Sequence, residues 1–408
     1  MRVAVITVHG CPVRQAGSKD SGGMNIYILE MVKRMAARGI QVDVFTRHHD
    51  PLDPEVVTLS PGARLIHLPS GSPSIDKTGL YDLLPEFSSQ MRRFCVDNRL
   101  GYEIVNTHYW LSGLVGIRLA SEWGVPHITS FHTMAVLKQL SRPEEKEVPQ
   151  RYSSEIELAS AVDSIVVWTQ NEKDSIVKYT GINGSKIRII PPGVDLGRFR
   201  PMSKVQSRAH LGYGSQKNIL FVGRLEPLKG LDRLFKAIAS LKNSSPVILN
   251  VVGGDDNSLE KTRLKAISEQ MNITKSVRFV GSVSQNDLPY HYSAADICVL
   301  PSYYESFGLA ALEASACGRP VVASDVGGLP TIVSNGISGF LVPPNRIDLM
   351  AEKLRDLLEN DLLRHRMGVA ARRSSESFSW DRSADSLLES YRDLVPKPKL
   401  SASSVAGG

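Results

Sequence analysis

Short apolar runs alternate with longer amphipathic stretches along the whole chain. The run from Val3 to Val8 is rich in β-branched residues, which predicts a β-strand. From Met24 to Arg38, apolar side chains recur three and four positions apart and stop at Gly39, which predicts a helix. Because this order recurs, we expect an α/β fold of parallel sheets covered by helices on both faces. The other strands predicted in the first half are Val42 to Thr46, Ile104 to Asn106, His127 to Ser130 and Ile165 to Trp168.

The alternation of apolar runs and amphipathic stretches is interrupted at residues 187–195, IRIIPPGVD, and then resumes. Two prolines and a glycine after an apolar run are typical of the exit from a domain. We therefore predict one domain over residues 1–195 and a second over residues 196–380. Residues 396–408, rich in Pro, Lys, Ser and Gly, predict a flexible tail. The strands predicted in the second half are the apolar run that begins at Asn218, Val247 to Val252, Val277 to Val280, Ile297 to Leu300, Val321 to Ala323, and Phe340 to Val342.

Composition agrees with two globular domains. The chain has 408 residues, of which 42% are apolar and 22% charged, as in soluble proteins. No apolar run approaches the roughly 18 residues that span a bilayer, and the first run is too short for a signal peptide. The four cysteines lie far apart without the spacing of metal ligands, which fits a reduced cytosol. We therefore expect a cytoplasmic protein.

The net charge is +6 and the isoelectric point is near 9.0. This mild excess suits an anionic ligand such as a nucleotide or a sugar phosphate, and also a weak association with the inner face of an anionic membrane. Residues 88–100 are the one weak candidate for a basic, apolar segment at a membrane surface. Nucleic acid is not expected as a partner, because no block of about five like charges appears.

Two glutamates stand out in the stretch from residue 301 to residue 318, PSYYESFGLAALEASACG. Glu305 lies in a polar, aromatic turn after an apolar run, and Glu313 lies about two turns into an alanine-rich helix. The small residues of this helix allow it to pack closely on a sheet. Both carboxylates can then face a crevice at the carboxyl ends of parallel strands, where open α/β sheets bind ligands. Two surface glutamates on an amphipathic helix are the simpler alternative.

Each half also has a glycine-containing loop between a strand and a helix. Residues 17–25, GSKDSGGMN, and residues 223–230, GRLEPLKG, both suit an anion at a helix N-terminus. In the second loop Arg224 and Lys229 are suited to a diphosphate leaving group. Ordinary loops with solvated cations are the alternative. Neither loop has the G-x-G-x-x-G pattern, so a nicotinamide cofactor is disfavoured.

Three histidines, His9, His108 and His132, each follow a predicted strand of the first half. A lone histidine is more often structural than catalytic, but this shared placement favours a common cleft. Lys77 and Arg151 are isolated cations, which taken alone are most simply surface charges.

Together these residues resemble the family 4 retaining glycosyltransferases of the GT-B fold, over nearly the whole chain. The two glutamates have the spacing of the family's E-x7-E motif. The resemblance implies two Rossmann-like domains that face a central cleft, with helix 381–395 crossing back to complete the first domain. The matching pieces are Gly22-Gly23, His132, residues 191–195, residues 223–225, Lys229-Gly230, residues 305–309 with Glu313, and residues 327–330.

By this resemblance the second domain holds the nucleotide sugar. Arg224 and Lys229 would bind the donor diphosphate, Glu313 the ribose hydroxyls, and Glu305 the donor sugar, with no nucleophile assigned. The residues implied in catalysis are His132, Arg224, Lys229 and Glu305. The further residues implied in donor binding are Gln15, Gly23, Phe307, Gly308, Leu309 and Glu313.

A closer likeness joins the chain to the family members that transfer N-acetylglucosamine to inositol phosphate. Lys77 and Arg151 would then form a phosphate clamp. The loop at residues 19–21 and the segment 137–148 depart from that group, and residues 281–286 show no arginine for the base. The residues implied in acceptor binding are His9, Asp20, Gly22, Asn25, Lys77, Tyr109, Thr133 and Arg151.

The resemblance therefore predicts retaining transfer of a hexose or N-acetylglucosamine from a UDP-sugar to a phosphorylated acceptor, with inositol phosphate favoured. Fructose 6-phosphate as in sucrose-phosphate synthases, a lipid or glycan acceptor at a membrane, and a non-catalytic sensor of nucleotide sugars remain as alternatives. No essential cofactor or side-chain metal site is expected. A magnesium ion bound by carbonyls would leave no sequence signal. A homodimer is expected by analogy alone.

Overall fold

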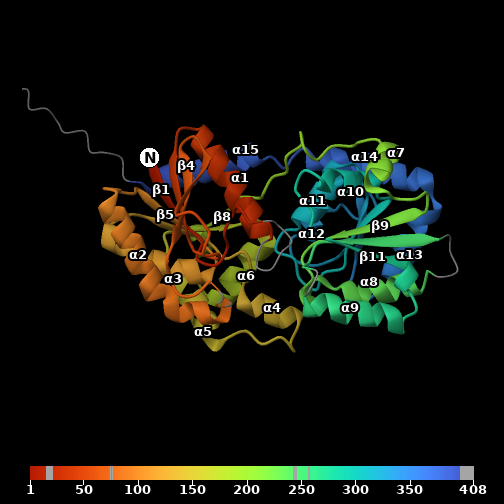
Figure 1. The fold of residues 1–408 in the computed structure, drawn as a ribbon, viewed down its shortest axis with the longest axis horizontal. Helices are drawn as coiled ribbons and strands as arrows, with labels where there is room; N and C mark the ends of the chain where they lie inside the picture. Colours follow the sequence, from red (N-terminus) through yellow and green to blue (C-terminus); the bar gives the residue numbers. More distant parts are fainter. Residues whose placement is uncertain (15–21, 74, 76, 242–245, 256–257, 396–408) are drawn as a thin grey trace, which may run out of the picture.

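The computed structural model describes residues 1–14, 22–73, 75, 77–241, 246–255 and 258–395, and the predicted tail falls outside this part. Two α/β halves lie side by side, as Figure 1 shows. Each half is built on its own sheet, which confirms the predicted fold class of two Rossmann-like units. The two sheets have the strand orders β3-β4-β2-β1-β5-β6-β7-β8 and β11-β10-β9-β12-β13-β14.

The first sheet is parallel except at one edge. β1 lies between β2 and β5, and its side chains are almost fully buried because helices cover both faces. Its strands are β1 (Arg2–Ile6), β2 (Gln41–Arg47), β3 (Val56–Ser60), β4 (Ala63–Leu68), β5 (Ile104–His108), β6 (His127–Ser130), β7 (Ser164–Val167) and β8 (Ile187–Ile189). Its helices are α1 (Gly23–Ala37), α2 (Leu84–Asp97), α3 (Trp110–Trp123), α4 (Ala135–Ser141), α5 (Pro149–Ala161) and α6 (Gln170–Thr180).

The second sheet is parallel in each pairing of its strands β9 to β14. Its central strand β9 lies between β10 and β12, so the loops that follow these strands meet at one edge. The strands are β9 (Lys217–Val222), β10 (Val247–Val252), β11 (Val277–Gly281), β12 (Ile297–Leu300), β13 (Val321–Ser324) and β14 (Gly339–Val342). The helices are α7 (Lys204–Leu211), α8 (Leu231–Ala239), α9 (Leu259–Gln270), α10 (Leu288–Ala294), α11 (Leu309–Ala316), α12 (Leu329–Ile332), α13 (Ile347–Glu359), α14 (Asp361–Ser375) and α15 (Trp380–Leu394).

The pattern of apolar runs did not predict the hairpin of β3 and β4. β3 pairs antiparallel with β4 and forms an edge of the first sheet. Its residues are intermediate or exposed, so it lacks the continuous apolar run of the buried strands. An edge strand needs less burial than a central one, which explains the weak sequence signal.

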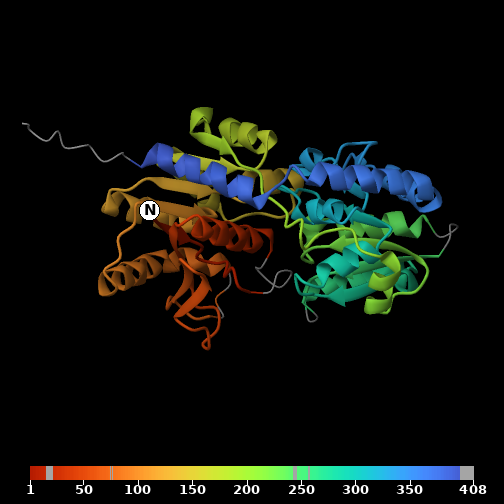
Figure 2. The ribbon, with the colours of Figure 1, turned by 90° about the horizontal axis from the view of Figure 1, so that it is seen from above.

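The last helix, α15, returns to the first half. It lies along α1, and Figure 2 shows it spanning the top of that half. The Tyr391 hydroxyl accepts a hydrogen bond of 2.7 Å from Asn106 Nδ2, and Arg38 Nε lies 2.5 Å from Asp385 Oδ1. The chain crosses itself at Gly193, where a Cβ would lie 2.0 Å from the Trp380 nitrogen. Only glycine fits at this crossing.

Helix α2 includes most of the segment considered as a membrane-surface candidate. Met91 and Phe94 are buried in the core of the first half, and Arg92 pairs with Glu122 at 2.7 Å. The apolar face of α2 is therefore part of the core, which corrects its interpretation as a membrane-facing segment. Among the described residues, no helix is long and apolar enough to cross a bilayer.

Candidate active site

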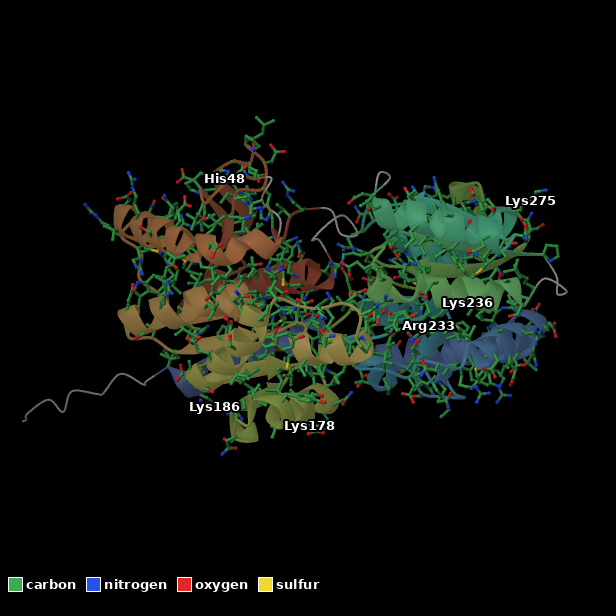
Figure 3. All side chains as sticks on the ribbon, turned by 90° about the horizontal axis from the view of Figure 1, so that it is seen from below. His48, Lys178, Lys186, Arg233, Lys236 and Lys275 are labelled. Carbon is green, nitrogen blue, oxygen red and sulfur yellow. The ribbon has the colours of Figure 1, made fainter. Side chains whose placement is uncertain are left out.

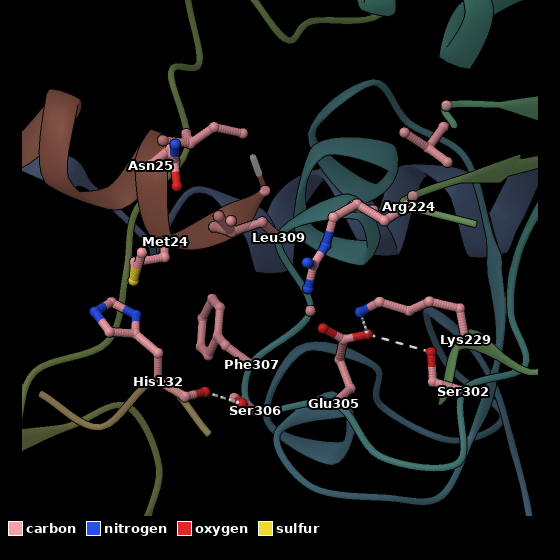
Figure 4. Close-up of a pocket in the computed structure, with 18 of the residues that line it drawn as sticks. Met24, Asn25, His132, Arg224, Lys229, Ser302, Glu305, Ser306, Phe307 and Leu309 are labelled. Carbon is pink, nitrogen blue, oxygen red and sulfur yellow. Dashed lines mark hydrogen bonds and ion pairs between the residues drawn. The ribbon is translucent and has the colours of Figure 1, made fainter. Parts of the chain in front are cut away.

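Loops from both sheets line one cleft of about 250 Å³. The lining residues follow β1, β5, β6 and β7 of the first sheet and β9, β10 and β12 of the second, so the cleft lies at the carboxyl ends of parallel strands. Figure 4 shows part of it. The predicted site residues that line the cleft are His9, Gly22, Gly23, Asn25, Lys77, Tyr109, His132, Thr133, Arg224, Lys229, Glu305, Phe307, Gly308, Leu309 and Glu313.

Two cations enter the cleft from the loop that follows β9. Arg224 Nη1 lies 2.7 Å from Glu226 Oε1, and Lys229 Nζ lies 2.7 Å from Glu305 Oε2. Although burial alone would raise the pKa of Glu226, Arg224 and Lys229 hold that pKa below its ordinary value. Glu226 therefore stays charged, and each of the two cations has a carboxylate partner in the cleft.

The N-terminus of α1 faces this loop from the other half. A Cβ on Gly22 would lie 3.1 Å from Arg224 Nε, so the guanidinium packs directly against that glycine. The helix begins at Gly23, where its dipole favours an anion. Together, the helix end and the two cations can stabilise a diphosphate from two sides.

Glu305 is fixed through both its side chain and its backbone. Its carboxylate also accepts a hydrogen bond of 3.2 Å from the Ser302 hydroxyl, and its carbonyl accepts one of 2.9 Å from the Gly328 N–H. Gly327 has φ of 53° and packs against the same carbonyl. The Gly327-Gly328 pair thus acts as a backbone support for Glu305.

Glu313 lies deeper in the cleft, on α11. It is 6% exposed, and its Oε2 accepts a hydrogen bond of 2.7 Å from the Tyr292 hydroxyl. Burial raises the pKa of the Glu313 carboxyl to about 7, although the Tyr292 hydroxyl and Arg198 act in the opposite direction. This carboxyl therefore titrates near neutral pH.

The histidine pair at the first-half wall is neutral. His132 Nε2 lies 2.9 Å from His108 Nδ1, and His132 has φ of 61°. Burial lowers the pKa of His132 well below its ordinary value, and the positive charge of a protonated His108 would lower it further. His132 Nδ1 is buried without a hydrogen-bond partner among the described residues. This nitrogen can bond a ligand hydroxyl.

Three residues that were predicted to bind the acceptor surround the ring of Tyr109. Lys77 Nζ lies 4.1 Å and Arg151 Cζ lies 4.7 Å from its ring centroid, and the His9 ring centroid is 4.5 Å away. Burial and the nearby Lys77 hold the pKa of His9 well below its ordinary value. Lys77 and Thr133 line the cleft beside this ring.

Arg151 does not line the cleft as the predicted clamp requires. It is 2% exposed, and it bonds Glu155 at 2.7 Å, Glu147 at 3.0 Å and the Thr133 carbonyl. Its five donors are largely used by these partners. The structure therefore corrects a direct phosphate contact to a supporting role behind Tyr109 and Thr133. The predicted contacts of Gln15 and Asp20 lie outside the described residues.

Sequence reasoning missed several lining residues. Glu226, Ser302 and Ser306 lie within loops that the sequence predicted to bind an anion or a sugar, but no spacing rule selected them. Trp168 follows β7, as Tyr109 and His132 follow their strands, so its position after a strand was an available signal. Among the described residues, no group of three or more His, Cys, Asp or Glu side chains has the geometry to hold a metal ion.

The class of protein follows from comparison with known families. Residues 21–198 match Glycosyltransferase Family 4, and residues 203–374 match Glycosyl transferases group 1. The chain is a glycosyltransferase of the GT-B fold, an enzyme that transfers a sugar. It belongs to the family that these two matches describe, and its relatives share nearly its full length.

D-inositol 3-phosphate glycosyltransferases are among these relatives. The Thermobifida fusca protein is 38% identical over 98% of this chain and 95% of its own length. The Corynebacterium jeikeium protein is 38% identical, with 97% of both chains covered. These identities confirm the predicted likeness to enzymes that act on inositol phosphate.

Solved structures show the same fold. Sucrose-phosphate synthase from Thermosynechococcus elongatus has a TM-score of 0.90 at 32% identity, covering 96% of this chain and 98% of its own. An Anabaena protein solved in complex with UDP and glucose has a TM-score of 0.78 at 19% identity, covering 97% of this chain and 100% of its own. The second likeness supports the fold alone.

Proposed function

We propose that this glycosyltransferase moves a hexose or N-acetylglucosamine from a UDP-sugar to a hydroxyl of a phosphorylated acceptor, with inositol phosphate favoured and retention at the anomeric carbon. The observation that carries the proposal is the single cleft that joins Arg224, Lys229 and Glu305 to Lys77 and Tyr109. The cleft therefore offers cations both for the diphosphate of the donor and for the phosphate of the acceptor. The 38% identical inositol phosphate glycosyltransferases support this acceptor class.

In this proposal the second half, residues 196–380, binds the donor, and the first half, residues 1–195 with 381–395, binds the acceptor. Arg224, Lys229 and the N-terminus of α1 hold the diphosphate, and Glu313 accepts hydrogen bonds from the ribose. Glu305 and His132 Nδ1 hold the donor sugar. The bond between the anomeric carbon and the phosphate oxygen breaks, and the acceptor oxygen bonds to the same face of that carbon. The departing phosphate oxygen takes the acceptor proton, so no protein nucleophile is needed.

Leaving-group charge is the main demand of this reaction, and Arg224 and Lys229 supply the positive charge. The proposal assigns no step to a metal ion. Acceptor binding places Lys77 and the Tyr109 and Thr133 hydroxyls around the phosphate, with Arg151 fixing Tyr109 and Thr133 from behind. Burial of the reaction in the cleft limits hydrolysis of the donor by water.

The test is mass spectrometry of reactions with UDP-N-acetylglucosamine, UDP-glucose or ADP-glucose, each paired with inositol 1-phosphate, inositol 3-phosphate or fructose 6-phosphate. A product from an inositol phosphate and a UDP-sugar is expected. A product from fructose 6-phosphate alone would select the second candidate, which the TM-score of 0.90 to a sucrose-phosphate synthase favours. UDP binding without any product would reject a phosphorylated acceptor and favour a lipid or glycan.

Replacing Lys77 with alanine is expected to raise the KM for the phosphorylated acceptor by about 10- to 100-fold, because a charge-assisted hydrogen bond to phosphate is lost. Steady-state kinetics with the acceptor varied would measure this. The KM for the donor should stay within about twofold of wild type. Lys178→Ala is the control, since Lys178 is exposed on α6 and Figure 3 shows it at the outer edge of the first half. An equal effect of both substitutions would contradict the assignment of Lys77.

The affinity for a UDP-sugar is expected to fall by up to about tenfold per pH unit below pH 7. Glu313 has a pKa of about 7, so it gains a proton as the pH falls and loses the charge that accepts the ribose hydrogen bonds. Burial keeps the pKa of His108 at about 3, and that of His132 also well below its ordinary value, so neither accounts for a change near neutrality. Calorimetric titration of the wild type and of Glu313→Gln from pH 6 to pH 8 tests this. A slope that persists in Glu313→Gln would assign it to another group.

A further inference from the structure

The connection between α4 and α5 carries an arginine that reaches the other half of the molecule. Arg142 follows the end of α4, which lies at the seam between the halves in Figure 1. Its Nη1 donates a hydrogen bond of 3.1 Å to the Pro227 carbonyl, and its Cζ lies 4.7 Å from the centroid of the Tyr303 ring. Both partners belong to the second half. Arg142 therefore forms a contact between the halves.

The ring of Tyr303 is rigidly held on the second half. Arg233 Cζ lies 3.3 Å from its centroid, and the Tyr303 hydroxyl donates a hydrogen bond of 3.1 Å to Asp232 Oδ2. Its N–H donates one of 2.8 Å to the Leu228 carbonyl. A guanidinium stacked on an aromatic face is a directional contact that depends on the position of the ring. Arg142 stacks on the Tyr303 ring only when the two halves lie against each other.

Arg142 is also fixed on its own half. Its Nη2 lies 2.8 Å from Glu144 Oε1, and its Nε lies 2.8 Å from Glu145 Oε1. The side chain is 15% exposed. Because these two carboxylates hold the guanidinium, it can meet the second half with little further loss of side-chain freedom.

The contact lies next to the residues that hold the leaving group. Pro227 and Leu228 directly precede Lys229, and Tyr303 precedes Glu305 by two positions. Lys229 and Glu305 themselves are 2.7 Å apart. Arg142 thus touches both loops that carry this ion pair.

Two further side-chain hydrogen bonds join the halves near the cleft. The Ser306 hydroxyl donates to the His132 carbonyl, and Asn171 Nδ2 donates to the Gly327 carbonyl at 3.3 Å. Neither touches the loop from residue 223 to residue 230. Arg142 is the side chain through which the α4–α5 connection contacts that loop.

We propose that Arg142 is a positioning residue, which aligns Lys229 and Glu305 with the donor when the first half closes against the second. The inference rests on the proposed roles of Lys229 and Glu305 in donor binding. Closure and correct alignment then occur together, because the same guanidinium bonds the Pro227 carbonyl and stacks on Tyr303. Donor binding to the second half does not require this contact.

Arg142→Ala is expected to lower kcat for sugar transfer about tenfold while the Kd for UDP, measured by calorimetry, stays within about twofold of wild type. Arg142→Lys keeps a cation but lacks the planar fork, so an intermediate loss of about threefold is expected. Arg93→Ala is the matched control, since Arg93 is exposed and forms its ion pair with Asp97 of the same helix. An unchanged kcat in Arg142→Ala, or a parallel loss of UDP affinity and melting temperature, would overturn the proposal.

A double-mutant cycle with Tyr303→Leu separates positioning from a general loss of structure. If Arg142 acts through Tyr303, adding Tyr303→Leu to the Arg142→Ala variant lowers kcat by less than about twofold further. Multiplicative losses in kcat would show that the two residues act independently and would refute the inference.

The closing measurement does not depend on the donor. The radius of gyration of the ligand-free protein, from small-angle X-ray scattering, is expected to be larger in Arg142→Ala than in the wild type and in Arg93→Ala. Equal radii in all three would overturn the role in closure. If the wild type fails to transfer sugar from any UDP-sugar, the proposed function fails, whereas a larger radius in Arg142→Ala would still support the contact between the halves.

Discussion

Replacing Lys229 with alanine is expected to lower kcat for sugar transfer by about 100- to 1,000-fold, the range observed when one preorganised charge-stabilising group is removed from an active site. Negative charge develops on the departing diphosphate, and the ammonium group lies in the same cleft as Arg224 and the N-terminus of α1. The substitution also removes the partner at 2.7 Å that holds Glu305. Rapid-quench or steady-state kinetics at saturating donor would measure the loss.

Lys236→Ala provides the matched control for this prediction. Lys236 is an exposed lysine on α8, seven positions further along, and Figure 3 shows it away from the seam. Its substitution should leave kcat within about twofold of wild type. Arg224→Ala should resemble Lys229→Ala, because the proposed function assigns both cations to the same diphosphate. A Lys229→Ala enzyme with nearly full kcat would mean that leaving-group charge is stabilised elsewhere.

Replacing Gly327 with alanine is expected to destabilise the fold by roughly 3–5 kcal/mol and to lower kcat by about 100-fold. A Cβ at this position would lie 1.8 Å from the Glu305 carbonyl oxygen, and the residue has φ of 53°. The backbone of Glu305 would have to move, which displaces a carboxylate that lines the cleft and is proposed to hold the donor sugar. Urea denaturation and steady-state kinetics on the same sample measure the two effects.

Comparison with Gly336→Ala separates the steric part of this effect from the backbone strain. Gly336 has φ of 76°, so alanine there suffers the same kind of backbone strain, but nothing lies within 4 Å of the added Cβ. A loss of about 1–2 kcal/mol with unchanged kcat is expected. If the two variants lost equal stability and equal activity, the close packing of Gly327 on Glu305 would not be what positions the carboxylate.

The strands and the donor motif were predictable because their signals are local. β1, β9 and β12 are continuous apolar runs, since both faces of a parallel sheet are buried. The spacing of Glu305 and Glu313 likewise follows from one turn and one helix. The hairpin of β3 and β4 escaped prediction because an edge strand needs less burial and leaves a weaker pattern.

Charge pairing was much less predictable. Arg151 reads as an isolated cation in the sequence, yet Glu147 and Glu155 hold it at 3.0 and 2.7 Å behind the cleft wall. The pairing of His132 with His108 depends on the parallel alignment of β5 and β6, which sets two loops beside each other. Periodicity reports which residues are buried but not which partner each buried polar group meets.

The two α/β units, their order of strands and helices, and the residue types at the ends of those strands therefore follow from the sequence alone. These properties depend on burial and on backbone geometry, which neighbouring residues largely decide. The tertiary structure decided that Gly22 meets Arg224, that Arg151 supports Tyr109 and Thr133, and that Arg142 reaches Tyr303. Each of these contacts joins segments far apart in the chain, and only the packing of the two halves brings them together.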